Sequence, residues 1–175
     1  MIRILLLILC PLISVGQVYK SEKSMVTFFS DAAVEDIKAE NTRSTSEINL
    51  GTGDLKFVVK NINFEFEKAL MKEHFNEKYM ETERFKESKF VGKLSGFDKN
   101  ASGEQSVRAA GKLTIHGQTK DVDVPGTMQL INDQLTVKSK FMVKLEDYKI
   151  KIPKLLWQNI AEEVEVSIDF TYKIQ

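Results

Sequence analysis

Cysteine is nearly absent from this sequence, because Cys10 is the only one among 175 residues. A lone cysteine cannot form a disulfide within the chain, so buried side chains must hold the fold together. A lipid-modified cysteine follows a small residue, whereas Leu9 precedes Cys10. We therefore expect Cys10 to carry no lipid.

Long hydrophobic runs are also missing. The longest is "ILLLILCPLISV", Ile4 to Val15, which is short of the roughly 20 residues that a membrane-spanning helix needs. Arg3 precedes the run and small residues ending at Gly16 follow it, which is typical of a cleaved secretory signal. We expect residues 1–16 to be a signal peptide cleaved after Gly16. Residues 17–175 would then form a single periplasmic or secreted domain, without integral membrane insertion.

No excess of charge of either sign is present, since 25 Lys and Arg residues balance 25 Asp and Glu residues. Because the charges are interspersed, no basic face is expected that could capture nucleic acid or an anionic membrane. Binding must then depend on shape and apolar contact. The sequence leaves open whether two copies form a homodimer.

Catalytic motifs are lacking as well. The sequence has no G-x-S-x-G nucleophile elbow and no glycine-rich phosphate loop, and the mature chain has no cysteine. His74 and Glu77 are three residues apart, but two ligands do not make a metal site and His116 lies in a distant turn. Glu146 and Asp147 lie in a charged run typical of a surface. The sequence predicts that the protein is not an enzyme and has no metal and no cofactor.

What the sequence does contain is alternation of apolar and polar residues. In "GKLTIHGQTKDVDVPG", Gly111 to Gly126, apolar residues such as Leu113 and Val122 alternate with charged and polar ones on both sides of the corner at His116. This pattern predicts two strands joined by a tight turn. Similar alternation predicts strands over residues 24–30, 55–60, 62–66, 89–97, 107–117, 121–131, 135–145 and 164–173, with weaker strands near 39–41 and 46–50.

Two segments are instead predicted to be helical. Between residues 67 and 82, the apolar residues Leu70, Met71, Phe75, Tyr79 and Met80 recur at spacings of three to five, as on one face of a helix. Pro153 begins a second, shorter segment near residues 153–163, because proline is favoured at a first helical position.

Many antiparallel strands with few helices to cover them predict a mainly β fold, a closed eight-stranded antiparallel β-barrel. Gly92, Ala109, Gly111 and Gly126 fall on apolar-facing positions and fill little volume, which favours an internal cavity. The glycines could instead be bend points of a sheet around a filled core. An outer-membrane barrel is a third interpretation, but the helical segment interrupts the strands and the chain ends in "YKIQ".

Four stretches, in order, resemble the YceI-like family of exported, lipocalin-like barrels associated with polyisoprenoid binding. They are "VTFFSDAAVEDIKAENT", "MKEHFNEKYMETERFKESKFVGKL", "GKLTIHGQTKDVDVP" and "KFMVKLEDYKIKIPKLLWQNIAEEVEVSIDFTY". Two features depart from the family pattern: "ERFKESKF" replaces a proline-threonine pair, and "KEHFNEKYM" replaces a more acidic segment. The departures leave the fold unchanged and put the identity of the ligand in question.

The resemblance implies a lipocalin-like barrel with a long apolar tunnel, a helix near one end and a lipid inside, such as an isoprenoid, an isoprenoid quinone or a fatty-acid-type molecule. The expected function is therefore that of an exported lipid-binding protein, with the lipid as its expected partner and a homodimer possible in addition. The alternative is a filled-core envelope or stress protein that acts through its surface. The residues expected to line the tunnel are Phe29, Phe57, Phe64, Phe66, Met71, Phe75, Tyr79, Phe90, Leu94, Ala109, Leu113, Met128, Val137, Phe141, Trp157, Val166, Ile168 and Phe170.

Overall fold

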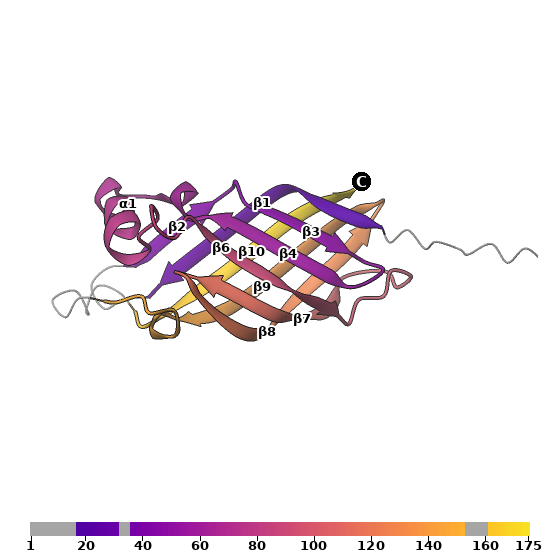
Figure 1. The fold of residues 1–175 in the computed structure, drawn as a ribbon. Helices are drawn as coiled ribbons and strands as arrows, with labels where there is room; N and C mark the ends of the chain where they lie inside the picture. Colours follow the sequence, from indigo (N-terminus) through magenta and orange to yellow (C-terminus); the bar gives the residue numbers. More distant parts are fainter. Residues whose placement is uncertain (1–16, 32–35, 153–160) are drawn as a thin grey trace, which may run out of the picture.

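The computed structural model describes residues 17–31, 36–152 and 161–175, and within them the chain is an elongated, mainly β structure (Figure 1). All the strands described belong to one antiparallel sheet. They are β1 (Val18–Ser30), β2 (Ile37–Asn41), β3 (Thr45–Asn49), β4 (Asp54–Lys60), β5 (Glu65–Phe66), β6 (Glu87–Ser95), β7 (Gln105–Ile115), β8 (Gln118–Ile131), β9 (Gln134–Lys144) and β10 (Glu163–Ile174).

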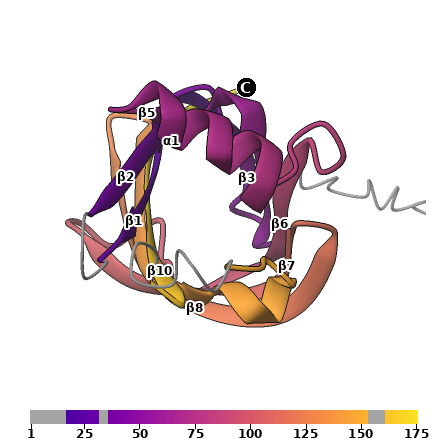
Figure 2. The ribbon, with the colours of Figure 1, turned by 90° about the vertical axis from the view of Figure 1, so that its left-hand side faces the viewer.

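The sheet closes on itself, because its first and last strands pair. The pairing of β1 with β10 runs from Tyr19↔Ile174 to Phe29↔Glu165. A continuous ring of antiparallel neighbours results, formed by β1, β3, β4, β6, β7, β8, β9 and β10. The predicted closed eight-stranded barrel is therefore confirmed, and its round cross-section is visible in Figure 2.

The strands β2 and β3 divide the length of β1 between them. β3 pairs with the beginning of β1 and β2 with its end, and β5 then adds to β2. Asn41 fixes the corner between β2 and β3. Its buried side chain accepts hydrogen bonds from Arg43 N and Ser44 Oγ, and its Nδ2 donates to the carbonyl of Lys60.

The strand predicted over residues 62–66 is wrong in its first half. Residues Asn61–Asn63 form a short 3₁₀ turn, η1, and of the predicted strand only β5 is paired in the sheet. Asn61 imposes the turn, because its backbone N–H donates to Lys86 O and its Nδ2 donates to Phe85 O. Ile62 is therefore 49% exposed instead of facing the core.

A helical segment covers one end of the barrel (Figure 2). It comprises α1 (Ala69–His74) and, directly after it, the π-helical turn η2 (Phe75–Tyr79), so it is shorter than the predicted helix over 67–82. The Met80 N–H donates to Phe75 O at 2.8 Å, which widens the turn and places these two buried side chains on one face. Leu70, predicted on the buried face, is 59% exposed.

The second predicted helix, over 153–163, lies largely outside the described residues. Its last residue, Glu163, already belongs to β10. Residues Leu145–Tyr148, which directly follow β9, form a 3₁₀ turn, η3. Figure 2 shows this turn lying against β8.

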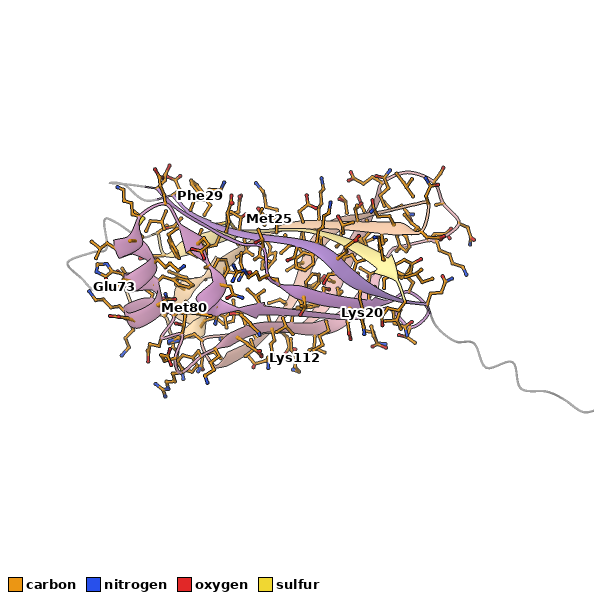
Figure 3. All side chains as sticks on the ribbon, turned by 90° about the horizontal axis from the view of Figure 1, so that it is seen from above. Lys20, Met25, Phe29, Glu73, Met80 and Lys112 are labelled. Carbon is orange, nitrogen blue, oxygen red and sulfur yellow. The ribbon has the colours of Figure 1, made fainter. Side chains whose placement is uncertain are left out.

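The outer face of the barrel is charged, as the stick view in Figure 3 shows around Lys20 and Lys112. Ion pairs link neighbouring strands there, including Lys112–Asp121 at 2.9 Å and Lys140–Glu165 at 2.9 Å. The apolar side of the alternating pattern thus faces the interior. The interpretation with apolar side chains turned outward to lipid does not fit this surface. Among the described residues, no helix has the length and apolar character that crossing a membrane requires.

The end of the barrel opposite α1 is solidly packed. Ile48, Leu135, Phe170 and Tyr172 have no exposed surface, and Tyr19 is almost as deeply buried. The Tyr172 hydroxyl donates to Ser46 Oγ at 2.8 Å. Burial raises the pKa of Tyr172 far above its ordinary value, so this phenol stays neutral.

Candidate ligand-binding cavity

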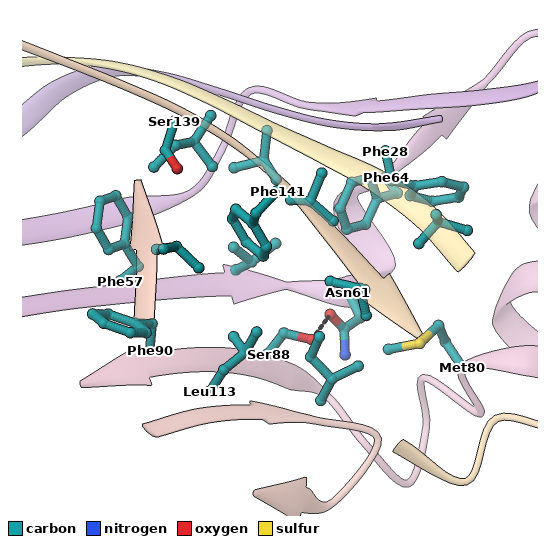
Figure 4. A pocket seen from close by; sticks show the side chains of 18 of the residues that line it. Phe28, Phe57, Asn61, Phe64, Met80, Ser88, Phe90, Leu113, Ser139 and Phe141 are labelled. Atoms are coloured by element: carbon teal, nitrogen blue, oxygen red, sulfur yellow. Dashed lines mark hydrogen bonds between the residues drawn. The ribbon is translucent and has the colours of Figure 1, made fainter. Parts of the chain in front are cut away.

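The part of the barrel nearer α1 is hollow. A cavity of about 560 Å³ is lined almost entirely by apolar side chains from β1, β4, β6, β7, β8, β9 and β10 and from the helical segment. Its size falls within the range of about 300–1,000 Å³ typical of sites for small molecules. Figure 4 shows the aromatic and aliphatic side chains that converge on it.

Four phenylalanine rings stand at the end of the cavity nearest the helix. Phe75 from η2 contacts Phe28, Phe64 and Phe66, with ring centroids 5.1–5.5 Å apart. Phe28 also contacts Phe64 at 5.4 Å. A chain that enters from this end must pass these rings.

Two other phenylalanines line the deep end of the cavity. Phe57 lies 6.4 Å from Phe90 and, on its other side, 5.0 Å from the fully buried Phe170, edge to face in both cases. Phe57 and Phe90 touch the hollow, whereas Phe170 belongs to the packed end. The two rings therefore lie between the hollow and the packed end of the barrel.

The buried polar groups in the wall already have partners. Asn61 Oδ1 accepts from Ser88 Oγ at 2.9 Å (Figure 4), and Ser30 Oγ accepts from the backbone N–H of Ala161 at 2.9 Å. Across the described residues, every buried side-chain nitrogen or oxygen has a hydrogen-bond partner. Burial also raises the pKa of the Tyr79 phenol. The wall thus favours an apolar guest, since a buried polar group without a partner is costly.

Most of the residues expected to line the tunnel do line this cavity. They are Phe57, Phe64, Phe66, Met71, Phe75, Tyr79, Phe90, Leu94, Ala109, Leu113, Val137, Phe141, Val166 and Ile168. Trp157 lies outside the described residues. Whether any of these side chains contacts a lipid stays a prediction.

The assignment of Phe29 to the interior is wrong. Val26, Phe28 and Ser30 line the cavity, so the intervening residues of β1 face outward. Alternation separates the two faces of a strand but does not say which one is buried. Here the contacts of Phe28 with the other phenylalanine rings settle the orientation.

Met128 and Phe170 point inward but do not line the cavity. Both are almost completely buried in the packed part of the barrel. Their faces were predicted correctly, but alternation contains no information about depth along the barrel axis. The expectation that they border the hollow is therefore wrong.

Several lining residues were missed by the sequence analysis. Val122 and Val124 had the right alternation and could have been included, whereas Asn61 and Ser88 carried no recognisable signal. Met80, which helical periodicity places on the apolar face with Met71 and Phe75, lines the cavity as expected. The residues missed are Val26, Phe28, Ser30, Ile37, Leu55, Val59, Asn61, Lys68, Leu70, His74, Ser88, Val107, Ile115, Val122, Val124, Pro125, Lys138, Ser139, Val143, Leu145, Ile150 and Val164.

The glycines were expected to leave volume inside, and only Gly126 lines the cavity. Gly92 and Gly111 are direct partners in the β6–β7 pairing. A Cβ on Gly111 would lie 2.4 Å from Val91 O and 2.5 Å from the Gly92 Cα. These two glycines therefore permit a close approach of the strands, as in the bend-point interpretation.

The two histidines occupy different places. His116 and Gly117 have φ of 48° and 69° and form the two-residue turn between β7 and β8. The buried His116 ring contacts Tyr148 O through Nδ1 at 3.1 Å and Glu81 Oε1 through Nε2 at 3.3 Å. His74 lines the cavity beside the helix. Within the described residues, no three His, Cys, Asp or Glu side chains are grouped so as to hold a metal ion.

A closed antiparallel barrel around an apolar cavity is an architecture that encloses small ligands in other barrel proteins. The sequence matches the YceI-like domain over residues 18–172, and the chain therefore belongs to the YceI-like family. The resemblance noted in the four sequence stretches is thereby confirmed. No functionally curated protein matches the sequence.

Solved structures share the fold at low sequence identity. A polyisoprenoid binding domain from Saccharophagus degradans, implicated in plant cell wall breakdown, has a TM-score of 0.77 and 16% identity, covering 90% of this chain and 98% of its own. BcnA of Burkholderia cenocepacia has a TM-score of 0.72 and 15% identity, covering 85% and 95%. The YceI protein of Campylobacter jejuni has a TM-score of 0.63 and 12% identity, covering 81% and 86%.

Proposed function

We propose that this protein binds a single apolar chain in the barrel cavity, namely an isoprenoid, an isoprenoid quinone or a fatty-acid-type lipid. The observation that carries the proposal is the cavity of about 560 Å³, whose wall is mostly apolar and whose buried polar groups already have partners. Family membership and the likeness to a polyisoprenoid binding domain support it.

The energetics of apolar burial favour such a ligand. Each methylene group that leaves water contributes about 0.8 kcal/mol, so a long chain can bind without a charged contact. The aromatic ends and aliphatic walls of the cavity supply apolar contact along the whole length of such a chain. We therefore expect affinity to rise with chain length until the cavity is full.

The alternative function, a filled barrel acting through its surface, requires side chains to occupy the interior. The cavity is the observation that favours the carrier instead. We also propose that the protein acts outside the cytoplasm, in the periplasm or after secretion. The signal-like composition of residues 1–16 supports this location, as does the start of β1 at Val18, directly after the expected cleavage site.

Extraction tests the proposal most directly. Residues 17–175 are purified and extracted with organic solvent, and the extract is analysed by mass spectrometry. We expect an isoprenoid or fatty-acid-type molecule in near-stoichiometric amount. The absence of any lipid, together with no binding of a fluorescent fatty acid by the extracted protein, would refute the proposal.

A matched pair of variants locates the binding site. Ala109 lines the cavity, whereas its neighbour Ala110 is exposed on the outer face of the same strand. Ala109→Leu should reduce lipid affinity several-fold with little loss of stability, because the added atoms take space from the ligand. Ala110→Leu should leave affinity unchanged. Equal effects of the two substitutions on binding would place the lipid elsewhere.

A further inference from the structure

The pairing between β8 and β9 covers only part of the two strands. It runs from Ile131↔Gln134 beside the turn to Gly126↔Ser139 and ends there. In contrast, β7 pairs with β8 along its whole length, and β9 pairs with β10 from Gln134 to Lys144. Among the described residues, the barrel wall thus lacks a hydrogen-bonded seam between residues 119–125 of β8 and 140–144 of β9. We call this stretch the lateral window.

Pro125 explains why the ladder stops. The turns at both ends of β8 have two central residues with positive φ, so their flanking residues form hydrogen-bonded pairs. Counting from either turn, the backbone groups of Pro125 point toward β9. Proline has no N–H to donate, and its carbonyl accepts the Ser139 hydroxyl at 2.6 Å instead. The next pair of the ladder cannot form.

The window lies directly beside the cavity. Val122 and Val124 on one rim and Phe141 and Val143 on the other line the hollow. A second depression, on the outer face, shares Pro125, Gly126, Ser139 and three further residues with the cavity wall. Where the ladder ends, the same few residues thus separate the cavity from the outer depression.

Contacts made by side chains hold the other end of the window. His116, in the β7–β8 turn, bonds to Tyr148 O of η3, which follows β9. Lys120 lies 3.8 Å from Asp147, again joining β8 to η3. Two polar contacts are easier to separate than a continuous strand ladder, so this end is the weaker one.

We propose that the lateral window is the route by which the apolar chain enters and leaves the cavity. This inference rests on the proposed function. A long chain can pass sideways through the window, whereas loading from the helix end requires it to move past four packed phenylalanine rings. The window extends from the deep end of the cavity, near Ser139, to the helix end.

A cross-link across the window tests the route. Residues 17–175 contain no cysteine, so Asp123→Cys and Met142→Cys introduce two thiols on the outer rims. A bifunctional maleimide then bridges them, and stopped-flow fluorescence follows the uptake of a polyene fatty acid. The control is Gln129→Cys with Thr136→Cys, two positions that are already paired in the ladder and do not line the cavity.

Bridging the window should slow uptake and release by at least about tenfold and change the equilibrium Kd by less than about threefold, because the route and not the site is altered. Bridging the control pair should leave both rates unchanged. An unchanged uptake rate in the bridged window variant overturns the inference while leaving the proposed function intact. Failure of the unbridged protein to bind the fatty acid overturns both.

Amide hydrogen exchange provides a check on the unmodified protein. The N–H groups of Asp123 and Met142 face the window and should exchange rapidly, whereas that of Thr127 should be protected by the ladder. Protection of the two window amides equal to that of Thr127 would show a closed wall and overturn the inference. Pro125→Val restores an N–H, so it should extend the ladder and slow uptake without a cross-link.

Discussion

The facing glycines of β6 and β7 give a sharp prediction about stability. In Gly92→Ala, the new Cβ would lie 2.4 Å from Ala110 O, 2.7 Å from the end of the Phe90 ring and 2.9 Å from the Gly111 Cα. The ring can rotate away, but the two backbone atoms can move only if β6 and β7 separate. The substitution should therefore disrupt the seam between the two strands.

The magnitude follows from the cost of overpacking, about 1–3 kcal/mol, with the upper end expected because the contacts are with backbone. Alanine restricts the unfolded chain more than glycine does, which stabilises the folded state by about 0.4–1 kcal/mol and offsets part of this cost. The net loss should be about 2 kcal/mol, which for a chain of this size lowers Tm by about 4–8 °C.

Urea unfolding measures this loss, with Val91→Ala as the control, since Val91 is 55% exposed on the same strand. Gly111→Ala should cost as much as Gly92→Ala. The double variant should cost less than the sum, because strands already separated by one methyl group accommodate the second. A loss of stability below about 0.5 kcal/mol for Gly92→Ala would refute the close-approach argument.

Two further substitutions test buried polar contacts by the free energy of unfolding. Tyr172→Phe removes the hydroxyl that donates to Ser46, so it should cost about 1–2 kcal/mol at neutral pH. Burial raises the pKa of Tyr172 above 10.0, so the stability due to its neutral form is complete below pH 10 and is lost as the pH rises beyond it. The difference between the wild type and Tyr172→Phe should therefore shrink in alkali, and a constant difference would contradict this. Asn61→Ala leaves the carbonyl of Phe85 and the hydroxyl of Ser88 without their partner, and should cost about 2–4 kcal/mol; a cost below about 1 kcal/mol would mean that water replaces both bonds.

Alternation was sufficient to predict the long barrel strands, because each has one apolar and one charged face. It failed where the backbone departs from regular pairing. The first residues of β1 were missed, since the register shifts between Ser21 and Lys23 and interrupts the pattern. The segment after Asn61 was wrongly extended as a strand because an asparagine side chain, invisible to periodicity, bends the chain into a turn.

The candidate site was predicted in outline for a similar reason. Inward-facing residues follow from periodicity, so side chains such as Phe57 and Phe141 were found. Periodicity does not give the position of a residue along the barrel axis. In a strand such as "VTFF", which is apolar on both sides, it also does not show which side faces inward. Phe170 and Phe29 were misplaced on these two grounds. The unpaired stretch beside Pro125 depends on the register of two strands, which the sequence does not state.

The seam between β1 and β10 has a consequence for how the protein is made. It joins the beginning of the domain to its end, and the Gln175 N–H donates to Val18 O at 3.0 Å. A growing polypeptide cannot close this ring until β10 has been synthesised, so the barrel can form only after almost the whole domain has been translated. Fragments that lack β10 would leave the edges of β1 and β9 unpaired, and such exposed edges favour aggregation and degradation.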